Sequence, residues 1–173
     1  MKKSVFVTGI AGSGKTSVSK ELNQLGYQSY DIEDDDFGLF MMVRKDTGEE
    51  YVDYDNHDLN KIDNAHWICN IEKLKEFLNK QIEGTVFYCG IASNNLEVKA
   101  LFDISFLLKA SPEVLTQRLL TREGGDDIGN TEEGRQRILS WKDEFEENMV
   151  KAGMTAVDAD GSPKEVANRI IEL

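Results

Sequence analysis

Eight residues near the N-terminus have the types and spacing of a loop that binds phosphate. They read Gly9-Ile10-Ala11-Gly12-Ser13-Gly14-Lys15-Thr16 and fit the pattern Gly-x-x-x-x-Gly-Lys-[Ser/Thr]. The glycines allow the backbone to turn tightly and to bring its N–H groups to phosphate oxygens. An apolar segment precedes the motif and a helical segment follows it, which is the context that the motif requires. The sequence therefore predicts a nucleoside triphosphate site.

Two side chains of this motif predict how the phosphates are held. The ammonium group of Lys15 should bridge the β- and γ-phosphates, and the Thr16 hydroxyl should ligate Mg²⁺. The alternative is a glycine-rich turn that carries a surface lysine. Because a strand and a helix flank the motif, we expect a site for ATP and Mg²⁺. The expected contacts to the nucleotide come from Gly9, Ala11, Gly12, Ser13, Gly14, Lys15, Thr16 and Ser17.

A metal-bound triphosphate also needs a carboxylate, and the second predicted strand ends in a segment that holds three. This segment reads Asp31-Ile32-Glu33-Asp34. The carboxyl ends of parallel strands form the edge on which α/β proteins bind ligands. We expect Asp31 to ligate the metal, to hold metal-bound water or to orient the acceptor, with Glu33 and Asp34 as its neighbours. The alternative is a solvated acidic turn.

Three classes of protein use such a site: kinases of small molecules, GTPase-type switches, and ATPase motors or regulators. Two tetrapeptides match GTPase motifs, Asn60-Lys61-Ile62-Asp63 and Asp126-Asp127-Ile128-Gly129, but their order along the chain is wrong for a GTPase. A motor normally ends its third strand in Asp or Glu, whereas the apolar run at residues 86–90 ends without a carboxylate. The kinase class therefore fits the sequence better than the other two.

Four arginines flank one glycine-rich loop in the second half of the chain. Arg118 and Arg122 are four residues apart on a predicted helix, and Arg135 and Arg137 follow the loop at residues 123–130. Phosphoryl transfer needs cations that stabilise charge on the moving group and a cover that excludes water. We expect arginines of this group to serve as catalytic cations. The alternative is surface ion pairing with neighbouring glutamates.

The elements that must position these groups alternate along the chain, which predicts an α/β fold with a parallel sheet. Ser111-Pro112 and Ser162-Pro163 each place a capping hydroxyl before a proline, and Glu165 completes a capping box. Strands are expected over residues 4–8, 27–31, 85–89, 104–109 and 155–158. Helices are expected over residues 15–25, 71–81, 94–102, 112–122, 132–151 and 163–171.

This layout resembles the P-loop small-molecule kinases of the adenylate kinase and shikimate kinase group. The shared features are the phosphate-binding motif, the carboxylates after the second strand, and the Arg-x-x-x-Arg and Arg-x-Arg pairs around a lid. Gly90-Ile91-Ala92-Ser93-Asn94 and Ile138-Leu139-Ser140-Trp141 further resemble a set of bacterial proteins described only as kinases or AAA-family ATPases.

The resemblance implies a three-layer P-loop NTPase fold with a five-stranded parallel sheet in the order 2-3-1-4-5 and helices on both faces. It also implies an acceptor-binding insertion at about residues 34–70 and a short lid at about 123–130. By the same resemblance Arg118 would lie against the adenine, Arg122 would meet the phosphates, and Arg137 would approach the transferred group.

The expected acceptor-binding region is strongly acidic. Residues 31–58 hold eleven acidic and two basic residues, Arg44 and Lys45, which gives a balance of 2 − 11 = −9. Kinases of nucleoside monophosphates hold the acceptor phosphate with several arginines, because a guanidinium fits that dianion well. The sequence therefore favours a hydroxylated acceptor without a phosphate, and nucleosides, sugars and amino-alcohols all remain eligible.

The residues expected to contact the acceptor include one aromatic side chain. Trp67 lies in a helix-like stretch and would either stack on a flat acceptor or simply pack in the core. The full set of expected acceptor contacts is Asp31, Glu33, Asp34, Arg44, Trp67 and Gly90.

Composition limits the partners and the compartment. The 173 residues carry a net charge of −12, which disfavours duplex nucleic acid and anionic membranes as partners. The chain is expected to form one domain over residues 1–173. No stretch approaches the ~20 apolar residues that a membrane span needs. The two cysteines form no Cys-x-x-Cys pair, and we expect a cytoplasmic protein.

Together these features predict an ATP- and Mg²⁺-dependent kinase that phosphorylates a small hydroxylated metabolite. The first alternative is a nucleotide-binding regulatory module or an ATPase without a small-molecule acceptor. Further alternatives are a nucleoside monophosphate kinase and a kinase of polynucleotide ends. The sequence does not predict the oligomeric state.

Overall fold

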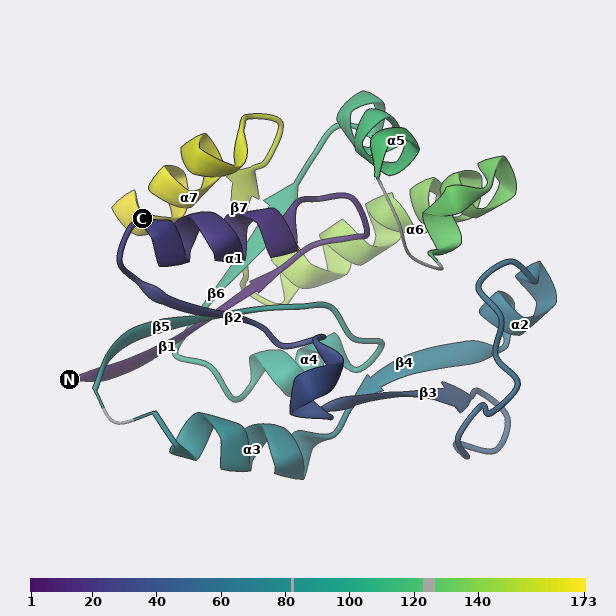
Figure 1. Ribbon diagram of the computed structural model, residues 1–173, viewed down its shortest axis with the longest axis horizontal. Coiled ribbons are helices and arrows are strands. Elements are labelled where there is room, and N and C mark those ends of the chain that lie inside the picture. Colours follow the sequence, from purple (N-terminus) through teal and green to yellow (C-terminus); the bar gives the residue numbers. More distant parts are fainter. Residues whose placement is uncertain (82, 123–126) are drawn as a thin grey trace.

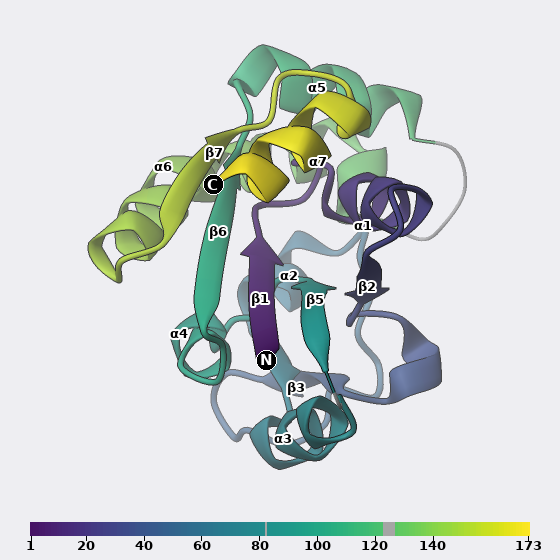
Figure 2. The same ribbon diagram turned by 90° about the vertical axis from the view of Figure 1, so that its left-hand side faces the viewer.

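A five-stranded parallel sheet forms the centre of the computed structural model, which describes residues 1–81, 83–122 and 127–173. Its strand order is β2-β5-β1-β6-β7. Counted along the chain, this is the order 2-3-1-4-5, as expected. Figure 2 shows the strands side by side, with β2 and β7 at the two edges. The strands are β1 (Lys2–Thr8), β2 (Gln28–Asp31), β5 (Gly84–Cys89), β6 (Ile104–Lys109) and β7 (Thr155–Asp158).

Side chains of the central strands alternate between two hydrophobic clusters, one on each face of the sheet. In β1, Val5 and Val7 join one cluster, whereas Phe6 joins the other. Both faces are apolar because helices cover both, as is usual for a parallel sheet. The expected three-layer α/β fold is confirmed.

The helices divide between these two faces (Figure 1). One cluster contains buried residues of α1 (Lys15–Gln24), α5 (Pro112–Thr121) and α7 (Pro163–Glu172). The other contains residues of α3 (Ile71–Asn79) and α4 (Asn95–Lys99). The long helix α6 (Glu132–Lys151) contributes Ile138 to the first cluster and Met149 to the second. Of the helices in the described part of the chain, none is long and apolar enough to cross a membrane.

The predicted helix caps are present. The Ser111 hydroxyl accepts a hydrogen bond from the Val114 N–H, and Ser162 and Glu165 form a reciprocal capping box. The bounds of β6, β7 and α6 agree with the sequence residue for residue. The helix expected over residues 94–102 is shorter, because α4 ends at Lys99.

The segment between β2 and α3 contains regular elements that the sequence analysis did not predict. It folds as η1 (Asp35–Phe37), β3 (Phe40–Arg44), α2 (Leu59–Asp63) and β4 (Ala65–Cys69). β3 and β4 form a two-stranded antiparallel sheet of their own, in which Met42 pairs with Trp67. The assignment of Trp67 to a helix-like stretch was therefore wrong, because this residue lies on a strand.

The loop after β5, residues 90–94, joins this small sheet to the main one. The Ser93 N–H donates to the Trp67 carbonyl over 2.7 Å, and the Trp67 N–H donates to Ser93 Oγ over 3.0 Å. The Asn94 side chain makes two hydrogen bonds of 3.0 Å to the backbone of Cys69. These contacts fix β4 beside the carboxyl end of β5.

Candidate active site

The phosphate loop, residues 9–16, joins β1 to α1 with the backbone that its glycines allow. Gly12 and Gly14 have φ angles of 84° and 101°, which residues with a Cβ rarely adopt. A Cβ on Gly9 would lie 2.5 Å from Ser13 Oγ and 2.9 Å from the Leu108 carbonyl oxygen. The loop is therefore packed tightly against β6 as well as turned sharply.

The N-terminus of α1 lies at the end of this loop, and its first N–H groups have no partner within the helix. The Ser13 N–H closes the loop by donating to the Ile10 carbonyl over 3.0 Å. The Ser13 hydroxyl is buried and has no partner among the described residues. This hydroxyl lies where a Cβ on Gly9 would be 2.5 Å away, so residue 9 has room only for glycine.

The side chain of Lys15 lies back across the loop that precedes it. Its Nζ donates to the Gly9 carbonyl over 2.8 Å and to the Ile10 carbonyl over 3.4 Å. The ammonium group is thus held at the loop, where carbonyl oxygens occupy its donors. Phosphate oxygens are stronger acceptors and would replace these carbonyls.

Thr16 and Asp31 form the site expected for the metal. The Thr16 hydroxyl donates to Asp31 Oδ2 over 2.6 Å, although the two residues belong to α1 and β2. A hydroxyl and a carboxylate are oxygen ligands, which suit Mg²⁺. Among the described residues, no group of three or more His, Cys, Asp and Glu is arranged to hold a metal. These two residues therefore fit an ion that phosphates and water would also coordinate.

Glu33 lies just beyond Asp31 and is held from two sides. Its Oε1 accepts the Ile91 N–H over 3.0 Å, and its Oε2 accepts the Trp67 Nε1–H over 3.1 Å. Burial is the main effect on the pKa of Glu33 and raises it above the ordinary value, with a further rise from the charge of Asp31. The charge of Lys15 and the two hydrogen bonds lower this pKa, but they do not cancel the rise.

Gly90 and Asp34, both expected at the acceptor, lie in different surroundings. A Cβ on Gly90 would lie 2.7 Å from Ile32 Cγ1 and 3.4 Å from Glu33 Cγ. Gly90 is therefore in contact with the segment that carries Glu33. Asp34 is exposed, and its side chain caps η1 by accepting the Asp36 N–H.

Arg118 binds the backbone of the phosphate loop. Its guanidinium donates to the carbonyls of Gly12 and Ser13 over 3.4 and 3.2 Å. It also donates to the carbonyls of Ala159 and Gly161 after β7, over 2.8 and 3.0 Å. This arginine thus ties the loop to the far edge of the sheet, whereas the resemblance places it against the adenine.

The arginines around the expected lid are ion-paired. Arg122 pairs with Asp127, and Arg137 on α6 pairs with Asp63 of α2 over 3.0 Å. Arg135 pairs with Glu132 over 2.9 Å. For this residue the structure shows the ion pairing with a neighbouring glutamate that was the alternative to a catalytic role. The first part of the expected lid, residues 123–126, lies outside the described residues, and the rest forms η2 (Ile128–Asn130) after Asp127.

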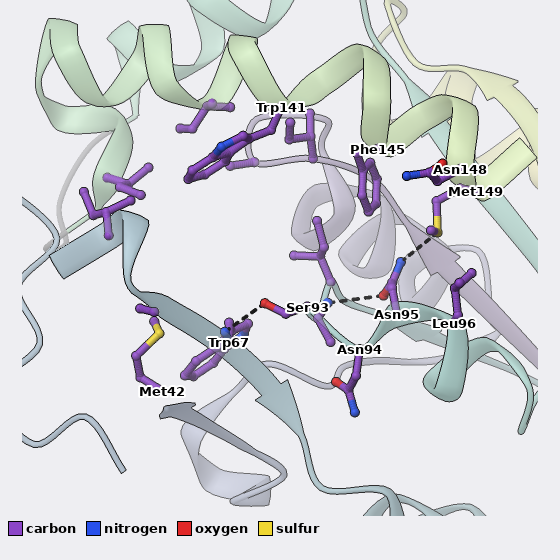
Figure 3. Close-up of a pocket in the computed structure, with 18 of the residues that line it drawn as sticks. Met42, Trp67, Ser93, Asn94, Asn95, Leu96, Trp141, Phe145, Asn148 and Met149 are labelled. Carbon is purple, nitrogen blue, oxygen red and sulfur yellow. Dashed lines mark hydrogen bonds between the residues drawn. The ribbon is translucent and has the colours of Figure 1, made fainter. Parts of the chain in front are cut away.

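A cavity of about 1040 Å³ lies beside the phosphate loop (Figure 3). Ile10 and Ala11 of the loop contribute to its wall, so the cavity adjoins the site expected for the triphosphate. Trp67 and Ile91, which hold Glu33, also line it. Its other walls come from the loop after β5, the segment between β2 and α3, and α6. The α6 residues include Ile138, Trp141, Phe145 and Met149.

Arg44 does not contribute to this cavity, although the sequence placed it at the acceptor. Its guanidinium pairs with Asp53 over 2.8 Å and lies 4.1 Å from the centre of the Tyr51 ring. No arginine is among the described residues that line the cavity. The walls therefore lack the group that best holds a phosphate dianion.

Sequence reasoning missed the wall that α6 contributes. Ile138, Trp141, Phe145 and Met149 recur every three or four residues, which places them on one helix face. This periodicity was visible in the sequence, but it does not distinguish a face that lines a cavity from one that packs in the core.

The comparisons with known proteins agree with this geometry. A family model described as AAA domain matches residues 5–140. A comparison with curated proteins found no match.

Several solved kinases share the fold. The shikimate kinase from Bacteroides thetaiotaomicron has a TM-score of 0.63 at 17% identity, over 98% of this chain and 97% of that chain. The shikimate kinase from Acinetobacter baumannii, in complex with shikimate, has a TM-score of 0.64 at 16% identity, over 99% and 92%. Deoxyadenosine kinase from M. mycoides with bound dATP has a TM-score of 0.56 at 18% identity, over 97% of both chains. At these identities the likeness concerns the fold. The chain belongs to the AAA domain family, and its fold is that of the P-loop small-molecule kinases.

Proposed function

We propose that this protein is a kinase that transfers the γ-phosphoryl group of ATP, with Mg²⁺, to a hydroxyl group of a small acceptor in the cavity. One observation carries the proposal. The Thr16–Asp31 pair and Lys15 lie at the phosphate loop, and Glu33 follows Asp31 with hydrogen bonds to two residues of the cavity wall. A site for a triphosphate and a site for a second molecule are therefore adjacent.

On the nucleotide side, the loop amides and Lys15 would hold the β- and γ-phosphates. Thr16 and Asp31 would hold Mg²⁺, which neutralises charge on the phosphates. The sequence left Asp31 with roles at the metal and at the acceptor. The 2.6 Å hydrogen bond to Thr16 favours the metal role.

On the acceptor side, Glu33 would accept the hydrogen of the reacting hydroxyl. The acceptor oxygen attacks the γ-phosphorus, the bond from this phosphorus to the β,γ-bridging oxygen breaks, and ADP leaves. The hydroxyl proton passes to the Glu33 carboxylate. Burial raises the pKa of this carboxyl, which makes it a better base than an exposed glutamate.

The arginines have separate roles in the proposal. Arg122 and Arg137 would stabilise charge on the transferring group after leaving Asp127 and Asp63. Arg118 would position the loop through its four carbonyl contacts. Residues 34–70 would bind the acceptor, residues 123–130 would form the lid, and residues 1–173 would act as one kinase domain.

Release of ADP with a panel of acceptors tests this proposal. We expect one class of hydroxylated compounds to stimulate ADP release, and removal of Mg²⁺ by a chelator to abolish the stimulation. Mass spectrometry of the acceptor should show one added phosphoryl group. Tight binding of ATP without stimulation by any compound would instead support a regulatory module or an ATPase.

A further inference from the structure

The loop after β5 contributes polar residues to the cavity wall, but their hydrogen bonds point into the protein. Ser93 Oγ accepts the Trp67 N–H over 3.0 Å. Both the oxygen and the nitrogen of the Asn94 amide bind the backbone of Cys69. Figure 3 shows the Asn94 amide turned away from the cavity. These side chains therefore hold β4 in place: both polar ends of the Asn94 amide are used, whereas the Ser93 hydroxyl only accepts and keeps its hydrogen for a ligand.

Asn95 is engaged in the same way. Its Oδ1 accepts the Ala92 N–H over 3.2 Å, and its Nδ2 donates to Thr8 Oγ1 over 3.0 Å. The residue is buried, with 3% of its surface exposed. At Asn94 and Asn95 a ligand hydroxyl would thus find few open partners, and a buried hydroxyl without a partner is costly; the other polar lining residues, Tyr54, Asn56 and Asn148, lie elsewhere in the wall.

The wall that α6 forms is apolar. Figure 3 shows Trp141 and Phe145 on the side of the cavity opposite Ser93 and Trp67. Trp141 is 39% exposed, which is unusual for the largest apolar side chain on such a wall. An aromatic ring of a ligand would cover this exposed surface.

Trp67 supplies a fixed aromatic wall across the cavity from Trp141. It stacks on Phe40, with ring centres 5.3 Å apart and planes 21° apart. Its Nε1–H is bound to Glu33. Both tryptophans of the chain thus line one cavity, and one of them also holds the proposed base.

The charges around the cavity disfavour strongly anionic ligands. No arginine of the described residues lines it, and the Glu33 carboxylate, next to Asp31 in the site, is hydrogen-bonded to two lining residues, Trp67 and Ile91. The charged side chains in its wall, Glu97 and Lys151, are exposed residues of α4 and α6. A strongly anionic acceptor would therefore be repelled where the reaction takes place.

Resting on the proposed kinase activity, we infer that the acceptor is an uncharged alcohol that also carries a flat aromatic or heteroaromatic ring system. Nucleosides belong to this class, because the base is a flat ring system and the sugar carries the hydroxyl groups. The ring would lie between Trp67 and Trp141, and the hydroxyl would reach Glu33. The two indole walls favour such a ligand over a free sugar, and the nearby Glu33 carboxylate disfavours polyol acids and nucleoside monophosphates.

Intrinsic tryptophan fluorescence tests this inference without any turnover, because both tryptophans line the cavity. The parent protein and Lys15→Ala are titrated with a set of nucleosides, with ribose, deoxyribose and gluconate, and with the matching nucleoside monophosphates. Isothermal calorimetry confirms each affinity. We expect at least one nucleoside to bind both proteins at least about 100-fold more tightly than its sugar alone.

Two variants at one position show whether a ring contact is responsible. Trp141→Ala should weaken nucleoside binding about 10-fold or more, whereas Trp141→Phe should keep most of it. Leu120→Ala removes an exposed apolar side chain of α5 outside the cavity and should change nothing. Circular dichroism and thermal unfolding establish that each variant is folded.

The outcomes separate this inference from the proposed function. Binding of a sugar or a polyol acid in preference to every nucleoside would overturn the inference that the acceptor carries a ring system. Binding of none of the compounds would overturn it as well. Phosphorylation of such a sugar would do the same while leaving the kinase intact. A nucleoside that binds between the tryptophans but is never phosphorylated would support the pocket and contradict the kinase.

Discussion

The phosphate loop and the cavity wall meet beside Ile10 and Ala11, but they are built from different kinds of sequence. The loop consists of consecutive residues, 9–16, whose conformation follows from glycines and from the strand and helix around them. The cavity wall is collected from segments between Ile10 and Ala152. In the proposed kinase, a local motif would thus carry the phosphate chemistry, whereas the packing of distant elements would determine the acceptor.

The two regions also differ in how their polar groups are used. In the phosphate loop, Lys15 and Thr16 are held by contacts that a triphosphate and a metal would replace. In the cavity wall, Ser93 and Asn94 bind the backbone of β4, so their contacts are structural. Changes in the loop should therefore affect every acceptor equally, and changes in the wall should affect acceptors unequally.

The largest effect is expected for Lys15→Ala. Loss of the cation that bridges the phosphates should reduce kcat/KM by about 1,000-fold or more with every acceptor. Steady-state ADP formation measures this, and thermal unfolding should show that the fold persists. Lys20→Ala, which removes an exposed lysine of the same helix, serves as the control. Transfer at the parent rate by Lys15→Ala would contradict the mechanism.

Glu33→Gln comes next, because Glu33 connects the two regions. Removing the proposed base should lower kcat by about 100-fold or more. In the parent, kcat/KM should rise with pH through the pKa of Glu33, because only the ionised carboxylate accepts the proton. Burial raises this pKa, so the acid limb should lie above that of an exposed glutamate. A pH–rate profile that Glu33→Gln leaves unchanged would rule out this role.

Gly90→Ala tests how closely the segment after β2 approaches the end of β5. The new Cβ would lie 2.7 Å from Ile32 Cγ1, so the backbone must shift, at a cost of about 1–3 kcal/mol in the free energy of unfolding. Urea unfolding measures this cost. Ile32→Ala removes the opposing atom, and the double variant should lose less stability than the sum of the single variants. If the losses of stability in the two single variants simply add in the double variant, the contact between residues 90 and 32 does not cause the loss in Gly90→Ala.

The smallest effect is expected for Asp63→Asn, which frees Arg137 from its ion pair. An exposed pair is worth up to about 1 kcal/mol, so kcat/KM for ATP should rise by no more than about five-fold. Initial rates at varied ATP concentration measure the change. Asp158→Asn breaks a pair with Arg169 on another element and should be silent. A decrease in Asp63→Asn would indicate that the pair is needed in the closed site.

The phosphate loop was largely predictable from the sequence because the residues that determine its conformation are neighbours in the chain. The motif at residues 9–16 predicts the tight loop between β1 and α1, and the parallel-strand pattern predicts that Asp31 comes to the same edge. The strand order followed from the family resemblance. The caps at Ser111 and Ser162 fixed two helix starts, since their partners lie three residues away.

The cavity was not predictable in the same way. β3 and β4 are separated by 20 residues, and the run Phe40-Met41-Met42-Val43 lacks the alternation that marks a half-buried strand. The contacts of Ser93 and Asn94 with β4 join residues 25 or more positions apart in the sequence, so they leave no local pattern. Likewise, nothing local shows that Arg44 pairs with Asp53 and Arg137 with Asp63.

The small β3–β4 sheet has a consequence for how this fold diversifies. In the described part of the chain its strands form no ladder with the parallel sheet, and the loop after β5 attaches them to that sheet through the backbone of Trp67 and Cys69. Sequence between two such anchoring points can lengthen, shorten or be replaced during evolution without any change of register in the parallel strands. If the proposed function holds, a new acceptor preference would then need changes in this small sheet alone, with the parallel sheet and the phosphate loop unchanged.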